Sequence, residues 1–435
     1  MQYLRCLALL ALYIEQVHAQ AVVERTMDDV LDPMQAPTGN VTMRTAFTPG
    51  EGGYTAFRIP GIVASFGVLH MFAEARKYSC ADFHGQTDVV YKQSTDAGLS
   101  FSPLKTLLDP VRLFGNAQCP TESTSSTNNC CAFWDPTPVV TRTGKLIVMA
   151  QRSWNHRITP KQNESSKDSR LMGFMDNWIL YSTDNGRSFT APKNITSQVW
   201  SDAWHMASTS NGHGLQTSSG RLIMPVYVHP TEQFLRFPQL AMRSAIYYSD
   251  DDGEHWHFPN TSVVGIGTSE SEIVELPVTA GGASGHQLLF NHRRNDLCGG
   301  QTPCPFSKTE ATRYQSFSTD NGLTFFNFSA VEALPDPGCK GGVIAWPTRH
   351  YPAGMLLTNA ASTTARQDIT LRWSPDGKTW PHAAKQLLSV PGGYSDVALL
   401  SFAQRDFACV LFEAPQCGPI KLAVVDPSTF LPVRQ

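Results

Sequence analysis

Short apolar stretches alternate with polar turns along most of the chain. Pairs such as GIVAS with VLHMFAEAR, or DPTPVV with KLIVMAQR, have the length and the β-branched and aromatic content of neighbouring strands. About six such sets follow one another after Tyr54, and no stretch of roughly ten or more residues has the periodicity of an amphipathic helix. The pattern predicts an all-β fold.

One turn pattern is repeated between these strands. Ser-x-Asp-x-Gly-x-x-aromatic begins at Ser94, Ser182, Ser249 and Ser318, and a copy that lacks one residue begins at Ser374. The Asp can accept hydrogen bonds from turn amides, the Gly can adopt positive φ without steric cost, and the aromatic side chain anchors the turn by burial. Because the copies begin roughly 55 to 90 residues apart, we interpret them as one turn in each four-stranded blade of a β-propeller with insertions of different lengths.

Composition and charge agree with this picture and exclude other classes. Charged residues make up 16% of the 435 residues, too few for a coiled coil or a disordered chain, and 32 Gly and 29 Pro suit many short strands and turns. The net charge of −3 gives no reason to expect nucleic acid as a partner. An anionic ligand would therefore need arginines that are gathered locally.

The N-terminus has the features of a signal peptide at residues 1–19. Arg5 precedes the apolar run at 6–14, and the small-residue end Val17-His18-Ala19 suits cleavage. We expect a polar leader at 20–48 that packs on the body, and one propeller domain at 49–435. No later stretch has about 18 uninterrupted apolar residues, so no transmembrane segment is expected. Sequons support a secretory route, with the lysosome and the extracellular space both open: Asn40, Asn163, Asn194, Asn260 and Asn327.

The cysteines predict disulfides and one remaining thiol. Ten cysteines less Cys6 leave an odd number in an oxidising compartment. The close pairs are Cys298 with Cys304 and Cys409 with Cys417, and Cys119 could meet Cys130 or Cys131. No Cys/His spacing or HExxH motif suggests zinc, and the acidic triplet at 250–252 lies inside a turn copy, so no metal is expected.

Several motifs together resemble one enzyme family. The repeated turn resembles the Asp box of sialidases, and FRIP, FAEAR, ITLRWS and GYSDV occur in the order found in that family, from about Tyr54 to the end of the chain. The chain looks closest to lysosomal, or type 1, sialidases. The resemblance implies a six-bladed β-propeller and a retaining exo-hydrolase without a metal or organic cofactor. It would remove terminal sialic acids from glycoproteins, oligosaccharides or gangliosides, so sialylated glycoconjugates are the expected partners.

Three arginines match the family's carboxylate-binding triad. They are Arg58 in FRIP, Arg293 at the end of LLFNHR and Arg366 in TTARQDITLRWS. Planar guanidinium groups bind a carboxylate through paired hydrogen bonds, and three of them without an anion would repel one another and be costly to bury. We place their neighbours on the outer rim or in ordinary salt bridges: Arg294, Arg349 and Arg372.

The resemblance also implies the reacting groups. Tyr394 in GGYSDV matches the nucleophile, and Glu270 in SESEIVELP matches its base, although strand alternation puts Glu272 on the same face. A carboxylate nucleophile would be repelled by the carboxylate on the sugar's anomeric carbon. A neutral phenol avoids this repulsion, but its pKa near ~10 means that it needs a base.

The other matched residues surround these groups. Asp82, six residues after Arg76, is the expected acid and later base, with Asp88 as its competitor. Arg76 resembles the family's fourth arginine, and Tyr227 is the candidate that meets the glycerol tail, ahead of His229. The competing functions are a non-catalytic Asp-box propeller, as a lectin or sorting receptor, and a trans-sialidase.

Overall fold

Antiparallel sheet forms nearly all the regular structure of this protein. The computed structural model describes residues 41–82, 85–115, 130–154, 175–201, 203–230, 242–276, 287–295, 311–346, 351–381 and 383–431. The chain divides into Met1–Thr38 and Gly39–Gln435, and the fold described here is that of the second unit. The predicted signal peptide, and the predicted leader up to residue 40, lie outside the described residues.

One sheet of eight strands begins the fold. Its order is β2-β3-β4-β6-β7-β8-β9, with β5 paired to β4. It consists of two antiparallel meanders that meet where β4 and β6 run parallel. The first meander contains β2 (Ala56–Ser65), β3 (Val68–Arg76), β4 (Gly85–Ser94) and β5 (Lys105–Leu108), and the second contains β6 (Cys130–Val140), β7 (Leu146–Trp154), β8 (Met175–Ser182) and β9 (Lys193–Asn194).

Four further sheets have four strands each. Three of them follow in chain order: β10 (Trp204–Thr209), β11 (Leu215–Gln216), β12 (Leu222–Pro230) and β13 (Arg243–Ser249); β14 (Thr268–Glu275), β15 (Leu288–Arg294), β16 (Thr312–Ser318) and β17 (Phe326–Pro335); and β18 (Gly342–Trp346), β19 (Gly354–Ala360), β20 (Ile369–Ser374) and β21 (Ala384–Gln386). The last sheet contains β22 (Ser395–Phe402), β23 (Arg405–Glu413), β24 (Ile420–Val425) and β1 (Val41–Phe47).

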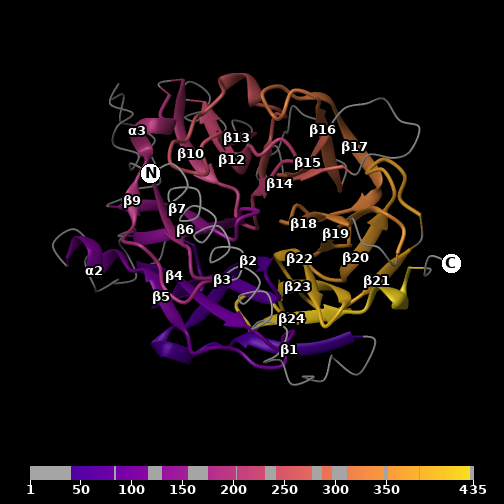
Figure 1. Cartoon of the computed structure of the whole chain (residues 1–435), viewed down its shortest axis with the longest axis horizontal. Helices are drawn as coiled ribbons and strands as arrows, with labels where there is room; N and C mark the ends of the chain where they lie inside the picture. The colour runs from indigo at the N-terminus through magenta and orange to yellow at the C-terminus, as the bar shows by residue number, and fades with distance from the viewer. Residues whose placement is uncertain are drawn as a thin grey trace, which may run out of the picture. The chain divides into compact units, whose positions relative to one another are not determined.

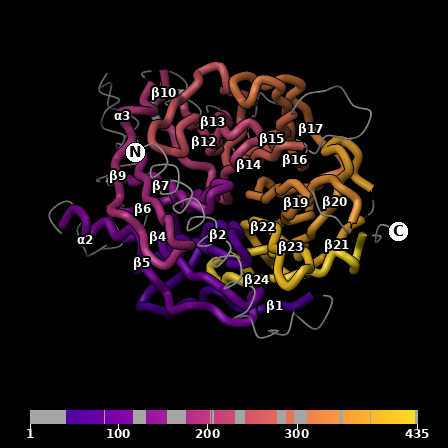
Figure 2. The backbone as a smooth tube through the Cα atoms, in the orientation of Figure 1, coloured from indigo at the N-terminus to yellow at the C-terminus, as the bar shows by residue number. Residues whose placement is uncertain are grey.

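The sheets follow one another around a common centre, as the ribbon and the backbone tube show (Figures 1 and 2). Neighbouring sheets and meanders touch there through a few strands: β2 touches β6 and β22, β14 touches β12 and β18, and β18 touches β22. Apolar side chains of neighbouring sheets pack between them; for example, Met149 of β7 shares a buried cluster with Val226 of β12. The prediction of an all-β, propeller-like fold is confirmed.

Both ends of the described chain build the last sheet. β1 pairs antiparallel with β24, with Val41 opposite Val425. Residues 41–47 of the predicted leader at 20–48 are therefore an integral strand, and the predicted domain boundary falls too late in the chain. The pairing supplies hydrogen bonds to an edge that would otherwise be open. It also ties the N-terminal strand to the C-terminal sheet.

The repeated turn has the predicted geometry. In the first copy, Ser94 Oγ donates to Asp96 Oδ1 at 2.7 Å and accepts from Gly98 N at 2.8 Å, and Gly98 has φ 83°. Each copy begins at the last residue of a strand, namely of β4, β8, β13, β16 and β20. A Cβ at Gly186 would overlap the hydroxyl of Tyr91 in the neighbouring meander, so the glycine also permits close packing.

Helices contribute little. The described α-helices are α2 (Pro110–Phe114) and α3 (Thr196–Val199), and short 3-10 turns occur at η1 (Glu51–Gly53), η3 (Asn260–Ser262) and η4 (Pro427–Thr429). Within the described part of the chain, no helix has the length and apolar character needed to cross a bilayer.

The cysteine pairing differs from the prediction. Cys80 and Cys417 form a disulfide, whereas Cys409 is a buried free thiol, so the predicted pair of Cys409 and Cys417 is wrong. Cys409 lies inside β23 between its two partner strands, and Cys417 lies in the exposed loop that follows. Cys339 is a second buried free thiol, and Cys131 is disulfide-bonded. Cys119, Cys298 and Cys304 lie outside the described residues.

A buried cluster of four charged side chains links the inner strands. Lys340 Nζ lies 3.3 Å from Glu272 Oε1 and 3.5 Å from Asp396 Oδ1, and His213 Nδ1 lies 2.9 Å from both carboxylates. Burial alone would lower the pKa of His213, but the two carboxylates raise it to about 10. Two positive charges therefore balance two negative ones. Three of these residues have the donor types of a metal site, but the ammonium of Lys340 supplies the positive charge between their carboxylates.

We expect Lys340→Met to destabilise the fold by about 3–5 kcal/mol, because it leaves buried carboxylates without their full compensation. The carboxylates also accept backbone N–H groups from other sheets, at Val343 and Ile62, so the loss should affect the whole fold. The measurement is urea unfolding followed by tryptophan fluorescence. Lys385→Met on strand β21 is the matched control, and an equal effect of both changes would contradict a special role for the cluster.

Candidate active site

A cavity of about 610 Å³ opens among the inner strands and their loops. Its volume lies within the range of small-molecule sites. All the residues predicted to contact the substrate or to react, apart from Arg76, line it: Arg58, Asp82, Tyr227, Glu270, Arg293, Arg366 and Tyr394. The remaining lining residues are Met242, Ser269, Asn295, Pro337, Gly338 and Gln416.

Three guanidinium groups converge on one aromatic ring. The Cζ atoms of Arg58, Arg293 and Arg366 lie 5.3, 5.6 and 5.2 Å from the ring centroid of Tyr394. The residues come from β2, from β15 and from the segment that leads into β20. Such a concentration of like charge favours an anionic ligand. Arg294 instead lies over Tyr314, outside the cavity lining.

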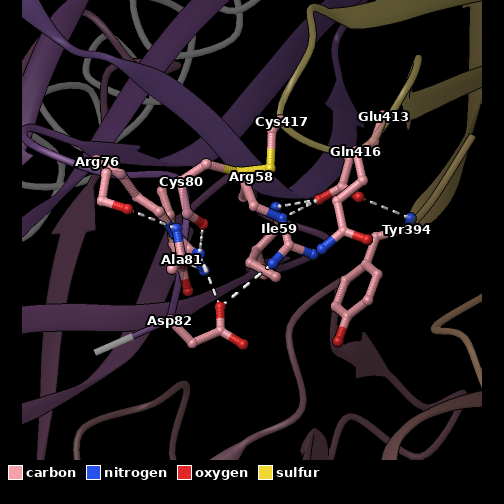
Figure 3. The surroundings of a disulfide bond; sticks show 12 residues. Arg58, Ile59, Arg76, Cys80, Ala81, Asp82, Tyr394, Glu413, Gln416 and Cys417 are labelled. Atoms are coloured by element: carbon pink, nitrogen blue, oxygen red, sulfur yellow. Dashed lines mark hydrogen bonds and ion pairs between the residues drawn. A yellow bond between two sulfur atoms is a disulfide. The ribbon is translucent and has the colours of Figure 1, made fainter. Parts of the chain in front are cut away.

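Glu413 holds one side of this arrangement. Its Oε1 accepts from Arg58 Nε at 3.0 Å and from the backbone N of Ile59 at 3.2 Å, and its Oε2 accepts from the backbone N of Tyr394 at 3.2 Å (Figure 3). A Cβ at Gly393 would overlap this carboxylate. Sequence analysis did not identify Glu413, although an acidic residue at the end of the apolar strand FACVLFEA was an available signal.

Tyr394, Glu270 and Arg293 form a hydrogen-bonded group. The Tyr394 hydroxyl donates to Glu270 Oε2 at 2.9 Å and accepts from Arg293 Nη1 at 2.6 Å, while Arg293 also pairs with Glu270. Burial raises the pKa of Tyr394 above its ordinary value, although the three arginines act to lower it. The phenol is thus neutral and has a carboxylate in place to receive its proton. Glu272 belongs to the central charged cluster, so Glu270 alone of the two reaches Tyr394.

Asp82 also lines the cavity, next to Arg58. Its side chain is 58% exposed, and Oδ1 lies 3.2 Å from Arg58 Nη1 and 2.7 Å from Arg76 Nη1. Burial acts to raise the pKa of Asp82, but Arg76 and Arg58 lower it below its ordinary value. Its competitor Asp88 is buried, accepts from the Tyr54 hydroxyl at 2.6 Å and does not line the cavity.

Arg76 occupies a different place from the one predicted. It is buried, does not line the cavity, and pairs with Glu74 at 2.7 Å as well as with Asp82. Because β3 places Glu74 and Arg76 on one face, protein carboxylates already engage the guanidinium. Arg76 thus supports Asp82, and its contact with a substrate stays a prediction.

A polar network that sequence analysis missed supports the other wall. Asn211 Nδ2 donates to Glu270 Oε1 at 3.0 Å and to Asp135 Oδ1 at 3.3 Å, and the hydroxyl of Tyr227 donates to Asp135 Oδ2 at 3.4 Å. Burial, followed by the charge of Glu74, raises the pKa of Asp135 to about 8. Asn211 has φ 52°, and the Asn-Gly pair in NGHG was a signal for such a turn.

Comparisons with known proteins show which family the chain resembles. Residues 85–400 match the BNR repeat-like domain family. A sialidase of Bacteroides fragilis (strain YCH46) is 26% identical over 373 residues, which cover 84% of this chain and 61% of the relative, and Sialidase-3 of Mus musculus is 26% identical over 418 residues, which cover 86% and 90%. Among solved structures, the Hadza microbial sialidase Hz136 has a TM-score of 0.72 at 23% identity and covers 89% of this chain and 69% of its own. The chain thus spans less than two thirds of the bacterial relative. The match of the family model over most of the chain, and the nature of these relatives, show that the protein belongs to the sialidase family.

Proposed function

We propose that the protein is a retaining exo-α-sialidase. Its substrates would be terminal sialic acids on glycoproteins, oligosaccharides and gangliosides. One observation carries the proposal. Arg58, Arg293 and Arg366 converge on the ring of Tyr394, whose hydroxyl donates a hydrogen bond to Glu270. Guanidinium groups suit the sugar's carboxylate, and the phenol–carboxylate pair suits attack at the adjacent anomeric carbon.

The reaction would proceed by two displacements. The arginines hold the substrate's carboxylate, Glu270 takes the phenolic proton as Tyr394 attacks the anomeric carbon, and Asp82 gives a proton to the departing glycosidic oxygen. Asp82 then takes a proton from water as the water attacks the anomeric carbon, the bond between that carbon and the Tyr394 oxygen breaks, and the phenol recovers its proton from Glu270. Two inversions at one carbon give net retention.

We also propose that the fold is a six-bladed propeller. Separating the eight-stranded sheet at the parallel contact of β4 with β6 gives two four-stranded meanders. With the four other sheets, they make six units of equal strand number around the cavity. In this arrangement the first strand of each unit faces the centre, which lets segments far apart in the sequence share one site.

The alternatives are a glycan-binding propeller without activity and a trans-sialidase. A binder would need the arginines but not the Tyr394–Glu270 pair or Asp82. The test is incubation with a panel of sialyllactoses, with the first product's anomer followed by NMR. Release of the α-anomer supports the proposal, whereas binding without turnover would support the lectin. Transfer to an added asialo acceptor, at the expense of hydrolysis, would support the trans-sialidase.

Arg366→Ala should lower kcat/KM for sialyllactose about 10- to 100-fold. The change removes charge-assisted hydrogen bonds worth about 1.5–3 kcal/mol, and each 1.4 kcal/mol corresponds to about a factor of ten. Among the described hydrogen bonds, the guanidinium of Arg366 makes one, to Gln416 at 3.3 Å, so its removal disturbs few other interactions. Arg372→Ala, at a position that does not line the cavity, is the control. Unchanged kcat/KM in the Arg366 variant would remove this residue from the carboxylate site.

The pH dependence should reveal Asp82 as the acid. Because Arg76 and Arg58 lower the pKa of Asp82 below its ordinary value in the free protein, the protonated form is lost at a lower pH than for an ordinary aspartate. The value of kcat/KM for sialyllactose should therefore fall with rising pH. A bound carboxylate neutralises part of the charge of Arg58, so the pKa of Asp82 should rise in the complex. The decline of kcat with rising pH should therefore begin at a higher pH than the decline of kcat/KM.

Steady-state profiles of the wild type and Asp82→Asn between about pH 3 and pH 9 check this prediction. With an aryl sialoside, whose leaving group needs little protonation, kcat/KM of Asp82→Asn should not decline as the pH rises. A kcat/KM that increases up to about pH 8 in the wild type would contradict the role of Asp82.

A secretory route, to the lysosome or to the extracellular space, remains part of the proposal. Three predicted glycosylation sites, Asn194, Asn260 and Asn327, are exposed, as glycan attachment requires. Asn40 and Asn163 lie outside the described residues. The expected closeness to lysosomal sialidases stays a prediction.

A further inference from the structure

A disulfide joins two loops at the wall of the cavity. Cys80 lies between β3 and β4, and Cys417 lies between β23 and β24, 337 residues later in the chain. Their Cα atoms are 5.6 Å apart. The bond thus links the first sheet to the last one beside Arg58 and Tyr394 (Figure 3).

Each loop carries a cavity side chain close to its cysteine. Asp82 follows Cys80 by two residues, and Gln416 directly precedes Cys417. Gln416 accepts from Arg366 Nη1 at 3.3 Å, and the carbonyl of Cys80 accepts from Arg76 Nη1. The disulfide therefore fixes the separation between the proposed acid and the carboxylate-binding side of the site.

Among the described residues, two ion pairs hold the side chain of Asp82. Residues 77–82 are exposed or half-buried, so the loop lacks a core of its own. The Asp82 side chain in these ion pairs with Arg58 and Arg76 is 58% exposed. Ion pairs that are open to water contribute little to stability. A covalent link removes conformational freedom that these contacts alone would leave to the loop.

We propose that the Cys80–Cys417 disulfide is a positioning element for Asp82, and that a thiol reductant lowers turnover of substrates whose leaving group needs a proton. The inference rests on the proposed sialidase function and on the acid role of Asp82 within it. Cys417 is exposed and Cys80 is half-buried, so a small reductant can reach the bond. A dithiol would break the S–S bond by giving it two electrons and two protons, which yields two cysteine thiols and the cyclic disulfide of the reagent.

The inference predicts a difference between two substrates. Sialyllactose releases a sugar alkoxide, which needs the proton from Asp82, whereas 4-methylumbelliferyl sialoside releases a phenolate that needs little help. Displacement of Asp82 should lower kcat/KM of the first substrate selectively, because kcat/KM reports the departure of the leaving group and not the later attack of water, which both substrates share. A general loss of structure would lower turnover of both alike.

The experiment compares the oxidised wild type, Cys80→Ser/Cys417→Ser and the wild type reduced with dithiothreitol. We expect kcat/KM for sialyllactose to fall about tenfold or more in the variant and in the reduced protein, and kcat/KM for the aryl sialoside to change by less than about threefold. Asp82→Asn serves as the reference for loss of the acid. Cys409→Ala, which removes a buried thiol away from the cavity, is the control and should retain both activities.

Alkylation and peptide mass spectrometry identify the reduced cysteines, so the reduced wild type decides the matter if the double variant does not fold. Equal losses on both substrates, or full activity on both, would overturn the inference while leaving the sialidase function in place. An oxidised wild type that cleaves neither substrate would overturn the proposed function, and this inference with it.

Discussion

Tyr394→Phe should lower kcat for sialyllactose by about 10²–10⁴-fold, because it removes only the hydroxyl that attacks the anomeric carbon. The ring would remain among the three guanidinium groups that surround it. Binding of a sialic acid analogue should therefore change far less than turnover. Steady-state kinetics and calorimetric titration of the same preparation measure the two quantities.

Tyr351→Phe provides a matched loss of a phenolic hydroxyl outside the cavity. That hydroxyl donates to Asp426 at 3.3 Å, and its removal should leave kcat unchanged. A Tyr394→Phe protein that works at the rate of the wild type would exclude Tyr394 as the nucleophile. Equal losses of binding and turnover would instead indicate that the hydroxyl serves the binding of substrate.

Glu270→Gln should also lower kcat for sialyllactose by about 10²–10⁴-fold, because the amide cannot accept the phenolic proton as a base. The hydroxyl of Tyr394 would still lie beside Arg293, which donates to it at 2.6 Å. With the aryl sialoside, the residual activity should increase with pH, since the phenol then loses its proton to solvent. The measurement is a pH–rate profile of the variant.

Glu275→Gln is the control for this substitution. Glu275 ends the same strand, β14, but interacts with Ser218 outside the cavity lining. Its replacement should leave both the rate and the pH profile unaltered. If Glu270→Gln keeps wild-type kcat at acid pH, the phenol must lose its proton to another group.

The charge balance of the site explains why it can remain folded without an anion. Three carboxylates pair with the converging arginines: Glu413 and Asp82 with Arg58, and Glu270 with Arg293. These carboxylates offset part of the repulsion, but Arg366 has no carboxylate among its described hydrogen-bond partners. A substrate carboxylate would complete this balance, which links binding affinity directly to charge.

Local features of the sequence predicted the strands and turns well. The Ser, Asp and Gly of each repeated turn bond to one another over four residues, so the pattern of side chains is sufficient to specify the geometry. The pattern of apolar strands likewise predicted the all-β class. β1 was missed because its polar and half-buried residues resemble a leader, and only pairing with β24 makes them a strand.

For the candidate site as well, the sequence predicted one part and the tertiary structure decided the other. Resemblance in sequence identified Arg58, Arg293, Arg366, Tyr394 and Glu270 one by one, and their meeting in one cavity depends on sheets that lie side by side around a centre. Sequence alone did not distinguish the surroundings of Glu270 from those of Glu272, because both share a strand face. Contact with Tyr394 in one case and with Lys340 in the other separates them.

The sequence by itself therefore determined the class of fold, the repeated turns and the kinds of side chain that the site would use, since these depend on interactions within a few residues. The tertiary structure alone decided that Glu413 holds Arg58, that Arg76 supports Asp82, and that Cys80 pairs with Cys417. The pairs Arg58–Glu413 and Cys80–Cys417 join sheets that are hundreds of residues apart in the chain. No local pattern encodes these two contacts, because they arise only when the first and last sheets pack against each other. Arg76 and Asp82 are close in sequence, but their pairing depends on how the loop after β3 folds back.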